Sequence, residues 1–243
     1  MTQFEMTPSS AFETSTVRTA ERVTSFLRAV YGWMFVGLGI TASVAYGVAY
    51  SGFAQVIATN PLLFWGLWLV PLGLGFVLQG RVDRMTPATA GTLFVIYSAS
   101  IGAWLSIIFL VYAHTAIASA LFVTAGMFGA VAVLGTVTRR SLAGVGQFAY
   151  MGFIGIFLAL LASVFIRPLA ANAGLQFVIS VAGVIVFTAL TAWDAQRLKQ
   201  MAATVPAERF TSYAVVGALH LYINFINLFL MLLRLLGGGG RRS

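Results

Sequence analysis

Three kinds of residue are scarce in this sequence, and each scarcity excludes a class of protein. Cysteine is absent from the 243 residues, which excludes disulfides, thiolate metal sites and thiol nucleophiles. Only 8% of the residues are charged, whereas about a quarter are charged in a soluble domain. The two histidines, His114 and His220, fall short of the about three ligands that a catalytic zinc needs. With no Gly-x-Ser-x-Gly nucleophile motif either, we expect a protein that is not an enzyme.

Long apolar runs are what the chain has in abundance. Hydrophobic residues make up 60% of it, and about 20 apolar residues in a helix span the roughly 30 Å of bilayer hydrocarbon. Runs of this kind lie near residues 26–50, 61–79, 88–112, 115–137, 147–166, 175–194 and 213–236. Because they are continuously apolar, they predict helices and not the alternating strands of a transmembrane barrel. We expect an all-α integral membrane protein with seven transmembrane helices, the third and fourth in a tight hairpin.

The apolar region divides the chain into three parts. Residues 1–25 are rich in Ser and Thr and carry acidic residues, unlike the basic leader of a cleaved signal, so they predict a cytoplasmic N-terminal tail. Residues 26–236 predict the transmembrane domain, in which glycine pairs such as Gly126 and Gly129 are expected at close helix contacts. Residues 237–243 open with four glycines and predict a flexible C-terminal tail.

Arginine and lysine are divided unequally between the two predicted sides. Ten of the 14 fall in segments that would face one side, residues 18–28, 81–84, 139–140 and 197–209. The positive-inside rule then predicts a cytoplasmic N-terminus and an outer C-terminus. These basic residues occur as ones and twos and form no contiguous stripe, so we expect no binding of nucleic acid.

Asp194 is the acidic residue that ends an apolar run. After residue 21 the only other acidic residues are Asp83 and Glu208. A carboxylate in hydrocarbon costs about 2.5 to 3.5 kcal/mol, so it tends to face a partner or a watery cavity. Asp194 is therefore a candidate functional residue. The alternative is that it marks the cytoplasmic end of the sixth span, where Arg197 and Lys199 follow.

The last span carries a polar seam, a set of side chains spaced 4, 3, 4 and 3 residues apart on one helical face. The seam consists of His220, Asn224, Asn227, Met231 and Arg234, and Gly217 extends it. Nearly everything else in the span is apolar, so we expect a central helix with its seam turned inward. Two of these residues also fit purely structural roles: Asn227 can form a hydrogen bond between helices, and the side chain of Arg234 can extend outward to the membrane interface. His220 or Asn224, beside an acid, would form a proton-sensitive lock.

Depth along the helices bears on which residue meets Asp194. At 1.5 Å per residue, His220 lies roughly 10 Å and Asn224 roughly 16 Å inside a span that begins at Tyr213. With Asp194 near the end of the sixth span, this depth favours His220 as the closer partner and leaves Asn224 open.

Three stretches carry a resemblance to a known family. They are FLRAVY at residues 26–31, TAWDAQ at 191–196, and LYINFINLF at 221–229 followed by Leu232-Leu233-Arg234. Through them the sequence resembles the transmembrane Bax inhibitor motif family, in its bacterial branch, over about residues 20 to 237. The resemblance implies six helices packed around a central seventh, and residence in the bacterial inner membrane.

The resemblance also implies a calcium leak that two aspartates of the last two helices control through pH. Close carboxylates share one proton, and its loss makes them repel. Asp194 matches the first aspartate, but Asn224 stands at the second position and cannot titrate, so we hypothesise that His220 supplies the titration. An arginine of the second helix is implied as a latch on the first aspartate. Arg81 is the best match and Arg84 the next, although both also fit ordinary positive-inside arginines.

Two functions remain open. The first is a pH-modulated calcium or cation leak in which Asp194 contacts the ion and no other cofactor takes part, although one acid is sparse for an ion that takes six to eight oxygens. The second is a regulatory protein that binds another membrane protein, since the resemblance extends to bacterial members associated with a membrane-bound ATP-dependent protease. Residues 1–25 would be accessible to such a partner.

Overall fold

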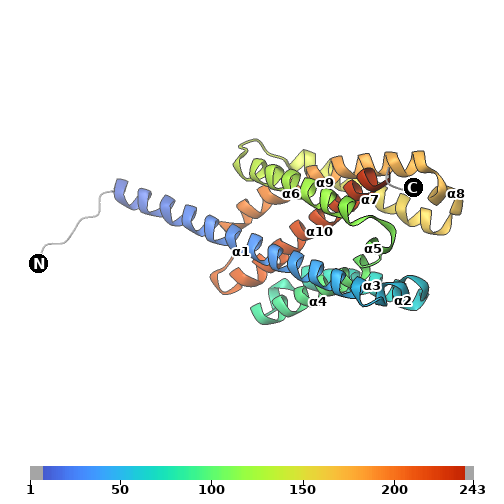
Figure 1. Ribbon diagram of the computed structural model, residues 1–243. Coiled ribbons are helices and arrows are strands. Elements are labelled where there is room, and N and C mark those ends of the chain that lie inside the picture. Colours follow the sequence, from blue (N-terminus) through green and yellow to red (C-terminus); the bar gives the residue numbers. More distant parts are fainter. Residues whose placement is uncertain (1–7, 239–243) are drawn as a thin grey trace, which may run out of the picture.

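The computed structural model describes the backbone of residues 8–238 and the side chains of residues 19–166 and 168–238. The described chain consists of helices joined by short loops (Figure 1). The helices are α1 (Pro8–Tyr50), α2 (Phe53–Thr59), α3 (Pro61–Gly80), α4 (Pro87–Leu105), α5 (Ile108–Val111), α6 (His114–Val137), α7 (Ala143–Phe165), α8 (Arg167–Ala171), α9 (Ala173–Ala202) and α10 (Phe210–Gly237). Two 3-10 turns, Val82–Arg84 and Ala207–Arg209, precede α4 and α10.

Seven helical segments in this part of the chain are long and apolar enough to cross a membrane, which confirms the predicted fold class. They are Thr19–Tyr50, Pro61–Gly80, Pro87–Val111, His114–Val137, Ala143–Phe165, Ala173–Ala202 and Ala207–Gly237. Their starts follow from local chemistry. The side chain of Asn60 accepts hydrogen bonds from the first amides of α3, and Asn172 caps α9 in the same way.

Two helix ends differ from the boundaries of the apolar runs, and parts of both predicted tails lie outside the described residues. Helix α1 begins at Pro8, so residues 8–25 are helical and continuous with the first span, while residues 1–7 of the predicted tail lie outside the described residues. Helix α9 runs on to Ala202, so Asp194 lies two turns inside the helix and not at its end. Of the predicted C-terminal tail, residues 239–243 also lie outside the description.

The predicted hairpin between the third and fourth spans is wrong. The connection is short, but α4 ends at Leu105 and the separate helix α5 precedes α6. Helix α4 packs mainly against α1 and α3, whereas α6 packs mainly against α9 and α10. The break therefore sends the two helices to different sides of the bundle.

Helix α10 is the central helix of the bundle. In Figure 1 it runs between a group formed by α1 to α4 and a group formed by α6 to α9. Of its most apolar stretch, 78% of the residues are buried, against at most 33% in any other span. It packs against α9, α1, α6 and α4. Helices α3 and α7 are more peripheral, since α3 packs mainly on α4 and α7 mainly on α9.

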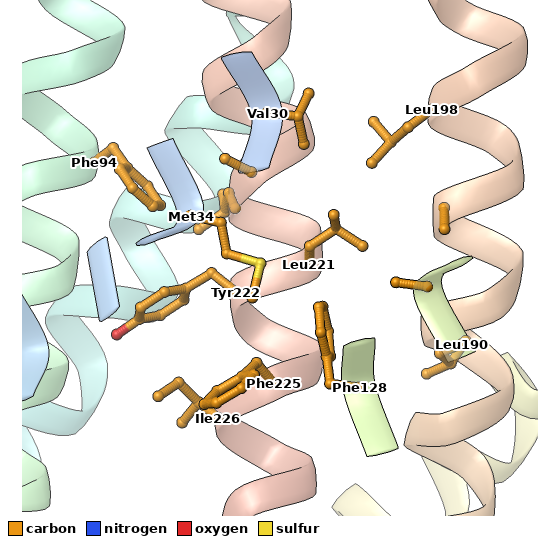
Figure 2. Packing of buried hydrophobic residues seen from close by; sticks show 14 of the residues in the cluster. Val30, Met34, Phe94, Phe128, Leu190, Leu198, Leu221, Tyr222, Phe225 and Ile226 are labelled. Carbon is orange, nitrogen blue, oxygen red and sulfur yellow. The ribbon is translucent and has the colours of Figure 1, made fainter. Parts of the chain in front are cut away.

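Large apolar side chains of α10 form the core of this arrangement. Figure 2 shows Leu221, Tyr222 and Phe225 of α10 among side chains of neighbouring helices, including Phe94 of α4 and Leu198 of α9. Tyr222 is completely buried, and its hydroxyl lies 2.6 Å from the hydroxyl of Thr41 on α1. Because its polar tip is satisfied, this aromatic ring can fill the centre of the bundle. The packing holds α10 in one rotation, which fixes where its seam points.

Only some of the glycines that recur within spans lie at close helix contacts, as Gly37 does against Phe94 and Gly152 against Val186. An added Cβ would meet nothing within 4 Å at Gly126 or Gly129. At Gly135 it would run into the backbone carbonyl of Ala192, and at Gly217 it would lie 2.6 Å from Leu198. The tight contacts of α9 with α6 and α10 therefore depend on glycines that the spacing pattern did not single out.

The four basic segments meet at one end of the bundle. Arg22 donates to the carbonyl of Val205. Arg209 pairs with Asp83 at 3.2 Å, which ties the loop before α10 to the loop before α4. Gln196 donates to the carbonyl of Arg140 at 2.9 Å and accepts from the amide of Leu142 at 2.8 Å, which adds the loop before α7. The segments predicted to share one side of the membrane therefore do lie together, and we call this the basic end.

Candidate functional site

A cavity of about 1770 Å³ lies beside α10. Side chains of α3, α4, α7 and α9 form its other walls. The whole seam of α10 lines it, namely Gly217, His220, Asn224, Asn227, Met231 and Arg234. The sequence therefore predicted correctly that these residues share one face turned toward the interior, and the structure gives that face a volume to line.

Two of the buried polar side chains of the cavity are bonded to each other. The side-chain amide of Asn224 donates a 2.7 Å hydrogen bond to Oδ2 of Asp194, which joins α10 to α9. Asp194 is 9% exposed and Asn224 is 5% exposed. A hydrogen bond to a charged group contributes about 1.5 to 3 kcal/mol, and an unpartnered buried group costs a similar amount. The pair is thus a polar clasp between two helices.

The prediction that His220 is the closer partner of Asp194 is wrong, because it placed side chains at the height of their own Cα atoms. Side chains lean toward the N-terminus of their helix. Helix α9 ends at the basic end and α10 begins there, so Asp194 leans into the bundle while Asn224 leans back toward the basic end. The two side chains meet, and His220 leans past Asp194.

His220 instead contacts α3. Its Nε2 lies 3.0 Å from Oε1 of Gln79, one residue before the end of that helix. Helix α3 touches α10 at few positions, so this bond is a main polar link between them. Sequence reasoning missed Gln79, although a signal was present: it is the only amide side chain in Pro61–Gly80.

Two other groups interact electrostatically with Asp194, namely the imidazole of His220 and the guanidinium of Arg197. Arg197 is exposed, and its guanidinium lies 5.6 Å from the centre of the Trp193 ring. Arg81 and Arg84 are exposed and, among the residues with described side chains, form no ion pair with Asp194. Their role as a latch stays a prediction.

The remaining seam residues lie toward the opposite end of α10, and they differ in how they are satisfied. Asn227 donates to the carbonyl of Ile223, four residues earlier in its own helix, at 2.9 Å. Among the residues with described side chains, Asn227 therefore does not form the interhelical hydrogen bond that was expected of it. Nη1 of Arg234 is buried and has no hydrogen-bond partner in the described part of the chain.

The residues available to a metal ion are few. Within residues 19–166 and 168–238, no three His, Asp or Glu side chains gather. Asp194 is the one carboxylate among the described residues that line the cavity. Calcium takes six to eight oxygen ligands, which is more than Asp194 and the amide oxygen of Asn224 supply.

The sequence was compared with known protein families and with individual proteins. A family model described as "Inhibitor of apoptosis-promoting Bax1" matches residues 23–241. The chain belongs to this Bax inhibitor family. Its similarity to the inner membrane protein YbhL of Escherichia coli K12 is 42% identity over 88% of this chain and 91% of YbhL. It is also 38% identical to an uncharacterised protein of Borreliella burgdorferi, over 87% of this chain and 91% of that protein.

A third relative is an uncharacterised membrane protein of Streptococcus pyogenes serotype M6, 33% identical over 87% of this chain and 92% of that protein. This Bax inhibitor family protein is thus an integral membrane protein that is matched over nearly its whole membrane domain. The stretches at residues 191–196 and 221–229, which carried the resemblance, include both partners of the Asp194 to Asn224 bond.

Proposed function

We propose that this Bax inhibitor family protein is a cation leak pathway of the bacterial inner membrane, with calcium as the transported ion and with opening modulated by pH. The observation that carries the proposal is the bond between Asp194 and Asn224 on the wall of the cavity. The name of the similar Escherichia coli protein, an inner membrane protein, supports the location.

The cavity supplies a route along α10. It is lined from Tyr213, in the first turn of that helix, to Arg234, in its last. Asp194 provides a negative charge beside this route, where a desolvated carboxylate attracts a cation strongly. While its Oδ2 is bonded to Asn224, α9 and α10 are held together. Opening in this account separates the pair and frees the carboxylate for the ion.

The pH dependence in this account comes from His220 and not from a pair of acids. An amide does not titrate, so Asn224 can donate to Asp194 over a wide pH range. His220 lines the same cavity and is an electrostatic neighbour of Asp194. Protonation in acid would place a positive charge beside the ion route, so flux is expected to rise as pH increases.

The experiment is calcium flux into liposomes that hold the purified protein, with empty liposomes as the baseline. Wild type should conduct, and Asp194→Asn should abolish flux because it removes the charge but retains an oxygen that accepts from Asn224. Asp83→Asn is the matched control, since Asp83 is exposed at the basic end and should leave flux unchanged. Flux in no variant would overturn the proposal.

A second candidate is regulation of another membrane protein, such as a membrane-bound ATP-dependent protease. It is favoured by α1, whose helix starts at Pro8, well before the first long apolar run near residue 26. Figure 1 places the N-terminal part of α1 apart from the other helices. With ten basic residues predicting that this end is cytoplasmic, deletion of residues 1–18 should abolish co-purification with the protease. Under the leak proposal alone, the same deletion should leave flux unchanged.

A further inference from the structure

The end of the cavity farthest from the basic end contains a partly buried arginine, one of whose guanidinium nitrogens has no hydrogen-bond partner among the described residues. Arg234 lies in the last turn of α10 and lines the cavity. Its Nη1 is buried, with no hydrogen-bond partner among the described residues. Burying an unpartnered charged group is costly, so this arginine calls for an anion that the described chain does not provide.

The acidic side chains of the chain are badly placed to supply that anion. After residue 21 they are Asp83, Asp194 and Glu208. Asp83 and Glu208 lie in the loops of the basic end. Asp194 bonds Asn224, which precedes Arg234 by ten residues, or about 15 Å along the helix. None of these three acids therefore pairs with Arg234, which leaves it able to bind an anion from the surroundings of the protein.

At the end of a transmembrane helix, the abundant anion is the phosphate of a lipid headgroup. The planar guanidinium of arginine matches phosphate oxygens with two parallel hydrogen bonds. A basic pocket between transmembrane helices is a recognised kind of headgroup site. Chemistry and position therefore favour a phospholipid over a soluble anion.

A second unpartnered donor lines the same cavity. Nε1 of Trp104, near the end of α4, is buried without a hydrogen-bond partner in the described chain. An indole N–H can only donate, so it too calls for an acceptor. Arg234 and Trp104 come from different helices, and each lacks an oxygen acceptor among the described residues.

The wall between these donors and the clasp suits an acyl chain. Side chains that line it from α3 and α7 are aromatic or aliphatic, namely Phe64, Trp65, Trp68, Phe157, Leu160 and Leu161. The cavity volume of about 1770 Å³ exceeds the roughly 300 to 1,000 Å³ of an ordinary small-molecule site. A long flexible chain fills such a volume better than a compact metabolite does.

From these observations we propose that the half of the cavity farthest from the basic end binds one anionic phospholipid. Its phosphate lies on Arg234, with Trp104 as a further donor, and an acyl chain lies along the aromatic wall of α3 and α7. The site is independent of whether the protein conducts ions.

Native mass spectrometry of the purified full chain in mild detergent tests the proposal. The protein is titrated with phosphatidylglycerol or with phosphatidylcholine of the same acyl chains. Wild type should retain one phosphatidylglycerol molecule, which neither phosphatidylcholine nor millimolar inorganic phosphate displaces. Dihexanoyl phosphatidylglycerol, whose acyl chains are short, should bind more weakly. Arg234→Gln should weaken binding by about tenfold or more, since it removes a charge-assisted pair. Arg234→Lys should keep the preference for the anionic lipid.

Arg28→Gln is the matched control, because Arg28 is an exposed arginine of α1, and it should leave the tight lipid in place. Trp104→Phe removes the N–H but retains a ring, and it should weaken binding about threefold. Gel filtration tests whether each variant is folded. If Arg234→Gln does not fold, Trp104→Phe is the variant that decides the test. Equal binding of the two lipids to wild type, or equal binding of phosphatidylglycerol to wild type and the folded variants, would overturn the proposal.

Discussion

The amide of Asn224 donates a 2.7 Å hydrogen bond to the buried carboxylate of Asp194. This bond joins the central helix α10 to α9, one of the helices that it packs against. The two residues occupy the positions at which the family resemblance implies two aspartates. One acid and one amide therefore stand where a pair of acids is expected, which changes how the contact responds to pH.

Restoring the second acid should restore a strong pH response. In Asn224→Asp, two carboxylates would share a proton in acid and repel each other once both ionise. We expect the melting temperature of this variant to match wild type near pH 5 and to fall below it by several degrees near pH 8, as measured by thermal unfolding in detergent. Asn227→Asp is the control, because it adds a carboxylate to the cavity at a residue whose described hydrogen bond is to Ile223 of its own helix, and without a second acid beside it the difference between the two pH values should be smaller.

Removing the hydrogen bond between Asp194 and Asn224 should lower the free energy of unfolding more than removing only the charge of Asp194. Asp194→Ala leaves the buried amide of Asn224 without its acceptor, so we expect a loss of about 1 to 3 kcal/mol in the free energy of unfolding. Asp194→Asn supplies another oxygen acceptor and should cost less. Denaturant unfolding of both variants measures the difference, and equal losses would show that the bond contributes nothing beyond charge.

The titrating group is expected to be His220. His220→Gln keeps a side chain that can bond Gln79 but removes the imidazole, so calcium flux should persist while its dependence on pH between 5 and 8 is lost. His114→Gln is the control, since His114 begins α6 and lies against Phe109. If both variants retain the pH dependence of wild type, another group titrates.

The tight contact between α6 and α9 predicts a difference between two glycines of one helix. Gly135→Ala places a methyl group against the backbone carbonyl of Ala192, which cannot move away as a side chain would. The expected cost is about 1 to 3 kcal/mol in the free energy of unfolding. Gly129→Ala meets open space and should be neutral or slightly stabilising, because alanine favours helix. Similar stabilities of the two variants would contradict this packing.

Hydropathy predicted the spans well, because apolar length is a property of the sequence alone. The seam was predictable for the same reason, since one helix places residues 3 and 4 apart on one face. The partner of Asp194 was not, because the lean of side chains in antiparallel helices and the continuation of α9 to Ala202 reverse the order that Cα depth suggests. Gln79 stands out as the only amide side chain of Pro61–Gly80, but its bond to His220 was missed because the sequence does not show that α3 approaches α10.

The central claim is that the route opens when α9 and α10 separate at the clasp. The absence of cysteine allows a direct measurement with Leu198→Cys and Gly217→Cys in one protein, since an added Cβ at Gly217 lies 2.6 Å from the Leu198 side chain. Calcium flux is measured in liposomes after oxidation and again after reduction. The account predicts that the disulfide reduces flux to the level of empty liposomes and that reduction restores it. Flux that is the same in both states would contradict it.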